Sequence, residues 1–449
     1  MKIRFFPAYE KLVELSLVFS LILLGFINLA VYKLNHHVTF PNVDEMLWYI
    51  RSKVFWDKIL ELDFSGLIQS AQPGITVYWF TGFLVAFIPK DGVAFSLLIN
   101  IFKAFREQNI NYNNFVNLNN ANTYAFYQDT SFLFNAPLFL LLTIFYILFY
   151  FLLRKIGFNR IISGLSLLLL TTNMYLAYWT TPADKMLVIF SVLSLLTFLV
   201  YMDQKPRKKY LALSAIFGAL AVLSKISALF IIPFFFSAYV FYVWPLNIAK
   251  VKIILKDLSI WALIFFIVCV VFLPTIVVFP GEVYSLIFRP STVYETNYGI
   301  AAYVNRTDAF SEVFGMISAS SIVRSLVLSF VFSAIVLSVS VPYKKYRKIL
   351  DFTPCKHTIT ITIFILAFIL MVTLVSKNHD IRQMSPAFAM LSIVVAVGVY
   401  NAIGIIKKRL NIQNEYIYLL VISLIAGIQL ASIFHGGSYV GAIILRYIG

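Results

Sequence analysis

Long apolar runs with almost no charged residues recur along the whole chain, and they limit its fold more than any other feature. A helix that crosses the hydrocarbon core of a bilayer needs about 20 apolar residues. The hydrocarbon core offers no hydrogen-bonding partner, so the backbone polar groups must pair within the protein. Such runs are therefore expected to form α-helices. The sequence predicts an all-α polytopic membrane protein with about eleven transmembrane helices, near residues 12–34, 131–153, 160–178, 185–202, 210–225, 226–245, 257–279, 316–341, 358–376, 385–405 and 415–434.

The composition excludes an ordinary soluble protein. The chain is 61% hydrophobic and 12% charged, with a mean hydropathy of +0.86, whereas soluble domains average about 25% charged residues. A net charge of +16 would suggest nucleic-acid binding in a soluble protein, but most of this excess lies in short loops between apolar runs. We see no separate soluble domain, so residues 1–449 are predicted to form a single integral membrane domain.

The basic loops alternate with loops that carry little positive charge. Cytoplasmic loops are enriched in Lys and Arg, which predicts a cytoplasmic N-terminus. We expect the protein to lie in the plasma membrane. On the same rule residues 35–130 form a large outer loop. The basic segments are 2–11, 154–160, 203–209, 250–256, 343–348 and 407–409.

The first outer loop is not uniformly polar. Residues 46–60 mix charges with tryptophan and aliphatic side chains, which predicts an amphipathic helix at the membrane interface. Residues 75–89 form an apolar run too short for a span, so we expect it to be interfacial or re-entrant. Residues 107–129 are rich in Asn and Tyr and are predicted to be a flexible surface insertion.

Three carboxylates fall on the predicted outer side. Asp44 and Glu45 follow the first apolar run, and Asp184 lies in a short loop between two later runs. Taken singly, each is most simply explained as a solvated loop acid. They are predicted to lie at similar membrane depth, and the cations expected at the same face favour a functional role.

Three cations are expected at the same face. Lys225 interrupts an apolar hairpin, where an ammonium is costly unless it reaches the interface or an anion. Lys377 and Arg382 lie in an outer loop, against the trend of the basic loops. They could extend to lipid headgroups, or they could form an anion site suited to a lipid phosphate.

These residues occur in an ordered set of motifs. An outer-loop "DE" (44–45) is followed by "QPG" (72–74), Asp184, "GALAVLSK" (218–225) and "SKNHDIRQMSP" (376–386). The set resembles the membrane glycosyltransferases of the GT-C fold, and is most similar to glycosyltransferase family 39, which is related to protein O-mannosyltransferases and lipid A aminoarabinose transferases. The resemblance covers nearly the whole chain. It departs at Gln72-Pro73, where the family commonly has His-Pro or Lys-Pro, and at Arg382-Gln383, where it usually has Arg-Tyr.

The resemblance implies a GT-C-like bundle that transfers a sugar, with inversion, from a polyprenyl-phosphate donor to an acceptor at the outer face. Asp44 would be the general base and Glu45 its helper, and Asp184 would orient the acceptor or a cation. The residues expected to bind the lipid phosphate are Lys225, Lys377 and Arg382, and those expected to line the acceptor cleft are Gln72, Pro73 and His379.

No cofactor is expected, because the donor is already activated on its lipid, although Asp44, Glu45 and Asp184 could bind a divalent metal. The expected partners are the lipid-linked sugar, membrane lipids and a protein, lipid or glycan acceptor, without nucleic acid. One alternative is a lipid-linked oligosaccharide flippase or transporter, which should show pseudo-symmetric halves and helices broken near the midplane. Another is an O-antigen-type polymerase, which would lack the early "DE" pair.

Overall fold

The fold is all-helical throughout the part of the chain that the structure describes. The computed structural model describes residues 14–16, 18–23, 43–65, 67, 74–84, 121–171, 182–203, 208–243, 247–281, 283, 355–375 and 385–409. Within these ranges the elements are helices and no strand occurs. The predicted all-α class is therefore confirmed.

The helices follow the chain in a simple order. They are α2 (Val43–Leu60), α3 (Ile75–Phe80), α6 (Ala121–Ile156), α7 (Arg160–Thr171), α9 (Pro182–Asp203), α10 (Lys208–Ser224), the 3₁₀ helix η2 (Ile226–Phe230), α11 (Ile231–Val243), α12 (Ile248–Phe272), α13 (Thr275–Val278), α18 (Cys355–Val375) and α19 (Ser385–Arg409).

Four described stretches are long and apolar enough to cross a membrane. They are Ala136–Ile156, Pro182–Asp203, Ile248–Phe272 and Ser385–Gly404. They agree with four of the predicted spans and support an integral membrane protein. The predicted spans at 316–341 and 415–434 lie outside the described residues, so the total of about eleven helices stays a prediction.

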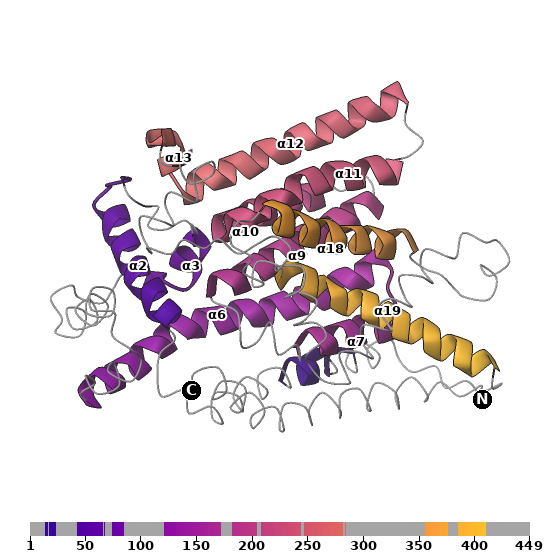
Figure 1. Ribbon diagram of the computed structural model, residues 1–449, viewed down its shortest axis with the longest axis horizontal. Coiled ribbons are helices and arrows are strands. Elements are labelled where there is room, and N and C mark those ends of the chain that lie inside the picture. The colour runs from indigo at the N-terminus through magenta and orange to yellow at the C-terminus, as the bar shows by residue number, and fades with distance from the viewer. Residues whose placement is uncertain are drawn as a thin grey trace.

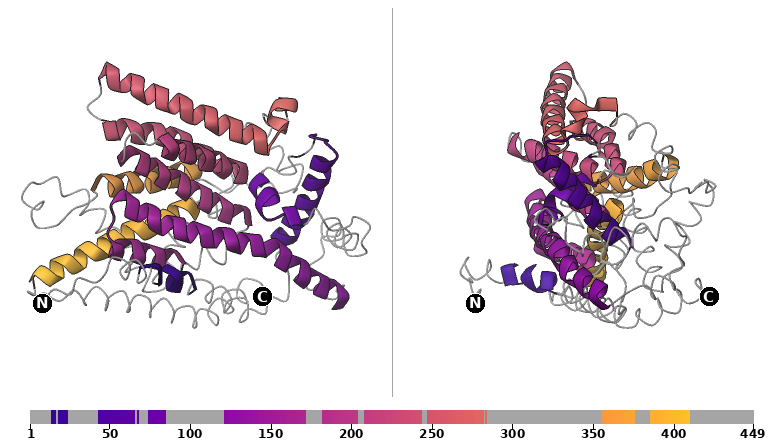
Figure 2. Two further views of the ribbon diagram at one scale, coloured as in Figure 1. Left: turned by 180° about the vertical axis from the view of Figure 1, so that it is seen from behind. Right: turned by 90° about the vertical axis from the view of Figure 1, so that its left-hand side faces the viewer.

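Helix α9 forms the centre of the bundle. In the most apolar stretch of α9, 94% of the residues are buried, against 22% in that of α12. Helix α9 packs against α10, α6 and α19, while α12 lies along one edge (Figures 1 and 2). Because α12 presents mostly exposed aliphatic and aromatic side chains, this edge is suited to contact lipid.

Small residues bring α9, α10 and α12 close together. Ser194 Oγ of α9 donates a hydrogen bond to the Ser214 backbone oxygen of α10 at 2.7 Å, and Trp261 Nε1 of α12 donates to Ser214 Oγ at 3.2 Å. A Cβ atom on Gly218 would lie 2.9 Å from Trp261 Cζ2. Close approach through Gly and Ser is typical of membrane helix interfaces.

Several predicted basic segments meet at one end of the bundle. Lys155 Nζ lies 4.7 Å from the centre of the Tyr210 ring, and Lys209 Nζ lies 5.4 Å from the same ring. His357 Nε2 lies 3.6 Å from Asp203 Oδ1. The loops near 154–160 and 203–209 therefore share one end, as their alternation in the sequence requires. The cytoplasmic location of that end stays a prediction.

The basic run 250–256 was wrongly predicted as a loop. Helix α12 begins at Ile248 and includes these lysines, so the span predicted at 257–279 starts earlier and ends at Phe272. The Asn247 side chain caps this helix by accepting a hydrogen bond from the Lys250 backbone nitrogen at 2.9 Å. Charged residues ended the apolar run, but they do not end the helix.

Two other boundaries differ from the prediction. Helix α6 begins at Ala121, so the last part of the predicted flexible insertion at 107–129 is helical. Intrinsic preferences are weak and are routinely overridden by tertiary context. Helix α9 begins at Pro182, a residue suited to the first helical position, so Asp184 lies in its first turn and not in a loop.

Helices α2 and α3 lie at the end of the bundle where α9 begins and α10 ends. Helix α2 crosses the direction of the bundle helices there (Figure 1). The helix predicted at 46–60 is confirmed within α2. Of the apolar run 75–89, residues Ile75–Phe80 are helical, and a turn follows at Thr81 and Gly82. Residues 85–89 lie outside the described part of the chain.

Candidate functional site

A buried ion pair joins α9 to the end of α10. Asp184 lies in the first turn of α9 and has no exposed surface, and Lys225 directly follows α10 with 3% of its surface exposed. Lys225 Nζ contacts Asp184 Oδ1. Taking two charges out of water is costly, so such a pair is weak evidence for stability. Buried ionisable residues in a membrane protein are candidates for function.

The local backbone directs Lys225 toward α9. Helix α10 ends at Ser224, and Lys225 is extended, with φ −149° and ψ 137°, before η2 begins. The Lys225 backbone nitrogen donates to the Ala221 oxygen and its oxygen accepts from the Ala228 nitrogen, both at 3.0 Å. The hairpin predicted at 210–245 therefore contains a short break, and the lysine occupies it.

The last residue of the "QPG" motif and the helix that follows it bind Ser224, the residue before Lys225. The Gly74 backbone nitrogen donates to the Ser224 oxygen at 3.2 Å. The Thr76 and Ser224 hydroxyl oxygens lie 2.6 Å apart. Gly74 has a φ of +58°, in the left-handed region that favours glycine. Two parts of the predicted motif set thus meet at Ser224.

Trp48 connects α2 to the same point. Its side chain is 3% exposed, and its ring lies against Gly74 so closely that a Cβ atom there would be 1.9 Å from Trp48 Cζ3. The Arg51 guanidinium carbon lies 5.4 Å from the centre of the Trp48 ring. Trp48 follows Asp44 by four residues, about one helical turn. The face of α2 that carries Trp48 and position 44 is therefore the face that meets Gly74.

Aromatic side chains hold α2, α3 and α12 together beside this point. Trp56 Nε1 donates to the Tyr78 oxygen at 2.8 Å, and Trp79 Nε1 donates to the Phe272 oxygen at 2.9 Å. The Trp56 and Trp79 rings lie 4.7 Å apart, and the Trp79 and Phe272 rings 5.5 Å apart. Both indoles are partly buried, and both N–H groups have a hydrogen-bond partner, as is usual for tryptophan in such positions.

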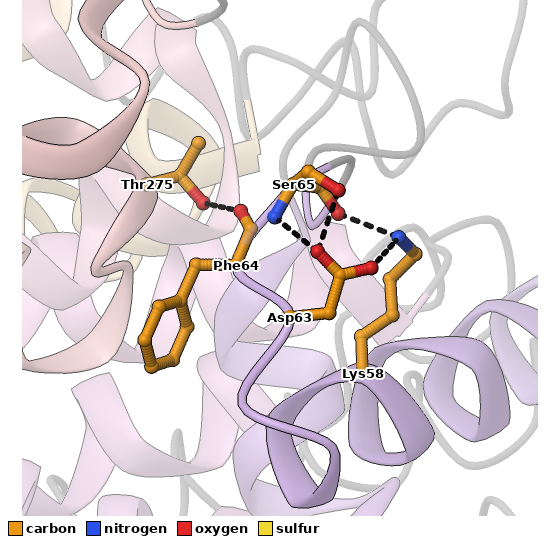
Figure 3. A network of polar contacts seen from close by, with 5 residues as sticks. All are labelled: Lys58, Asp63, Phe64, Ser65 and Thr275. Atoms are coloured by element: carbon orange, nitrogen blue, oxygen red, sulfur yellow. Dashed lines mark hydrogen bonds and ion pairs between the residues drawn. The ribbon is translucent and has the colours of Figure 1, made fainter.

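The turn after α2 is fixed by a polar network, shown in Figure 3. Lys58 Nζ donates to Asp63 Oδ2 at 2.8 Å and to the Ser65 oxygen at 2.7 Å. Asp63 Oδ1 accepts from the Ser65 nitrogen and hydroxyl. The hydrogen bond from Lys58, followed by those from Ser65, lowers the pKa of Asp63 to about 2. Thr275 Oγ1 donates to the Phe64 oxygen at 3.0 Å, which joins this turn to α13.

The structure describes some of the predicted site residues and not others. The structure brings Asp184 and Lys225 together, and their roles in orienting the acceptor or binding a phosphate stay predictions. Asp44 and Glu45 lie in the first turn of α2, but their side chains are not among the described ones. Their catalytic roles stay predictions. The remaining predicted residues lie outside the described part of the chain: Gln72, Pro73, Lys377, His379 and Arg382.

Sequence reasoning missed Trp48 and Gly74 as parts of the site. In the sequence, Trp48 is one of several aromatic residues of the predicted interfacial helix, and Gly74 is one residue of a motif. A Pro-Gly pair before a short apolar run is a turn signal that calls for φ > 0, so Gly74 could have been found from it. The contact between the two residues depends on tertiary packing.

The metal assignment stays untested. Among the described residues, no group of three or more His, Cys, Asp or Glu side chains is placed to hold a metal ion. Two of the three proposed ligands, Asp44 and Glu45, are not described at their side chains.

The fold and the site define a polytopic helical membrane protein with a buried Asp–Lys pair at one end of the bundle. Residues 96–284 match the family model of dolichyl-phosphate-mannose-protein mannosyltransferases, which is of GT-C family 39 type. The match covers less than half of the chain and includes Asp184 and Lys225, whereas Asp44, Glu45 and Gly74 precede it. Over residues 96–284 it agrees with the resemblance seen in the sequence, whereas the motifs at 44–45, 72–74 and 376–386 lie outside the match. No curated protein and no solved structure matches the chain.

Proposed function

We propose that the chain is a glycosyltransferase that moves a sugar, with mannose as the first candidate, from a polyprenyl-phosphate donor to an acceptor at the outer face of the membrane. The observation that carries this proposal is the buried Asp184–Lys225 pair, which lies within the matched residues 96–284. The name of the matched family supports a dolichyl-phosphate-mannose type of donor and a protein acceptor.

The reaction is a single displacement at the anomeric carbon. The acceptor oxygen forms the new bond on the face opposite the lipid phosphate, and the bond to the phosphate oxygen breaks with both electrons leaving on that oxygen. The acceptor hydroxyl gives its proton to a carboxylate. We assign this base to Asp44, with Glu45 as helper, because Asp44 lies one helical turn before Trp48, whose ring contacts Gly74. A positioned base contributes about 10²–10⁴-fold to such a rate.

Lys225 is proposed to face the charge that develops on the departing phosphate. A cation that is already fixed in a dry site stabilises this charge without reorganisation. Asp184 would hold the ammonium in place through their buried contact. Lys377 and Arg382 are proposed to complete the phosphate site. The donor brings its own activation, so this mechanism uses no nucleotide, and a metal at the acidic residues is not required.

The direct test uses the purified chain in lipid nanodiscs with a radiolabelled polyprenyl-phosphate-mannose and a mixture of unfolded secreted proteins as acceptor. We expect labelled sugar on protein, with polyprenyl phosphate released in equal amount. Lys225→Met should weaken donor binding roughly 10–100-fold, as expected for losing a charge-assisted contact. Lys58→Met is the matched control, because it removes the same charge at the same end without touching the pair.

Two outcomes would overturn the proposal. The flippase alternative predicts that labelled lipid crosses the membrane of sealed vesicles with its sugar still attached. The polymerase alternative predicts that the label appears in a growing glycan and not on protein. Neither outcome is compatible with single transfer to a protein acceptor.

A further inference from the structure

Gly74 lies between the two parts of the proposed site. On one side its backbone nitrogen donates to the Ser224 oxygen at 3.2 Å, directly before Lys225. On the other side the Trp48 ring fills the space that a side chain would need: a Cβ atom would lie 1.9 Å from Cζ3 and 2.2 Å from Cη2. Gly74 thus contacts both Trp48 of α2 and Ser224 at the end of α10.

We propose that Trp48 and Gly74 are positioning residues for sugar transfer, and this inference rests on the function proposed above. Their contact would set the separation between the first turn of α2 and the Lys225–Asp184 pair. The reaction needs a base at the acceptor oxygen and a cation at the phosphate in the same complex. A misplacement of about 1 Å can cost about 10²-fold in rate.

The geometry of α2 explains why Trp48 can do this. Residues four apart lie on the same face of a helix, so position 44 shares its face with Trp48. That face is the one that meets Gly74. A shift of the indole against Gly74 would therefore move the backbone at position 44 relative to Ser224.

The Trp48 ring is held from other sides as well. Its centre lies 5.8 Å from the centre of the Tyr78 ring, and the Arg51 guanidinium carbon lies 5.4 Å from it. With 3% of Trp48 exposed, the ring has little room to retreat from an added atom. A methyl group at position 74 must therefore move α2, α3 or the end of α10.

The test is a rescue experiment that removes the atoms of the Trp48 six-membered ring that lie against Gly74. Gly74→Ala should lower kcat for transfer roughly 10–100-fold, with KM for the lipid donor changed less than about threefold, because the Lys225–Asp184 pair is kept. Trp48→Phe removes the part of the indole that includes Cζ3 and Cη2, so the double variant Gly74→Ala/Trp48→Phe should recover a large part of the lost kcat.

Gly157 provides the matched control for backbone strain. It also has a positive φ, of +104°, but nothing lies within 4 Å of the position of its Cβ. It follows α6 at the end where Lys155 meets Tyr210. Gly157→Ala should therefore carry the conformational cost of replacing glycine, with kcat unchanged.

The results distinguish a failure of the positioning role from a failure of the proposed function. An active parent whose Gly74→Ala variant keeps the parental kcat overturns the positioning role alone. A low kcat in Gly74→Ala that Trp48→Phe does not raise also overturns it, because the defect then does not arise from their contact. A parent that transfers no sugar to any acceptor overturns the proposed function, and this inference falls with it.

Discussion

Lys225, just beyond the end of α10, forms an ion pair with Asp184 in the first turn of α9, and both side chains are buried. The two residues are far apart in the sequence and come from opposite ends of their helices. The pair connects the hairpin that carries Lys225 to the central helix of the bundle. Because the Lys225 ammonium is buried and paired, its position is set by contacts within the protein.

This pair predicts a strong coupling between two substitutions. Removing one partner leaves a buried charge without its counterion, so Asp184→Asn or Lys225→Met should each destabilise the protein by about 3–5 kcal/mol. The double variant should cost less than the sum of the two. Thermal unfolding of the four proteins in one detergent measures this. Additive effects would show that the two charges do not depend on each other.

A second prediction concerns Asp257 of α12, which accepts hydrogen bonds from Tyr201 and Tyr239 at Oδ2. This cluster joins α12 to α9 and α11, and all three side chains are buried. Tyr239→Phe should lower the free energy of unfolding by about 1.5–3 kcal/mol, because it removes a hydrogen bond to a carboxylate.

The control for this prediction is Tyr146→Phe in α6. The Tyr146 hydroxyl makes no hydrogen bond to the described residues, so the substitution should change stability much less. Equal losses for the two phenylalanine variants, measured by chemical unfolding, would argue against a role of the Asp257 cluster in holding α12.

A third prediction concerns pH and the turn after α2. Asp63 has a folded pKa of about 2, below its unfolded value of about 3.9. A lowered carboxyl pKa stabilises the fold above the unfolded pKa, and this contribution disappears as the pH falls through the folded pKa. Asp63→Asn should therefore lower the unfolding temperature at pH 5 and have a smaller effect at pH 2.5. An equal effect at both values would contradict the role of the charged form.

The sequence predicted the central helices well, because continuous apolar runs define them. Helices α9 and α19 agree with the spans predicted at 185–202 and 385–405 to within a few residues. The start of α12 was missed, because lysines at 250–256 end the apolar run while the helix continues beyond it. The cap at Asn247 was a usable signal for the true start.

For the site, the sequence placed Asp184 and Lys225 at one face but not in contact. That both residues lie near one face follows from the alternation of basic loops. Their contact depends on how α9 packs against α10. The contact of Trp48 with Gly74 was beyond prediction for the same reason. Asp257 was also missed, since it stands at the edge of a predicted span and its two tyrosine partners belong to other helices.

The measurement that tests the central claim most directly compares Asp44→Asn with the parent for sugar transfer and for donor binding. Asn keeps the shape of the side chain but cannot accept the proton, so transfer should fall about 10²–10⁴-fold while the donor still binds. Glu45→Gln is measured in parallel. If Glu45→Gln alone is inactive, the two carboxylates exchange roles and the mechanism stands. If both variants transfer sugar at the parental rate, the account of this site as a glycosyltransferase with its base on α2 is contradicted.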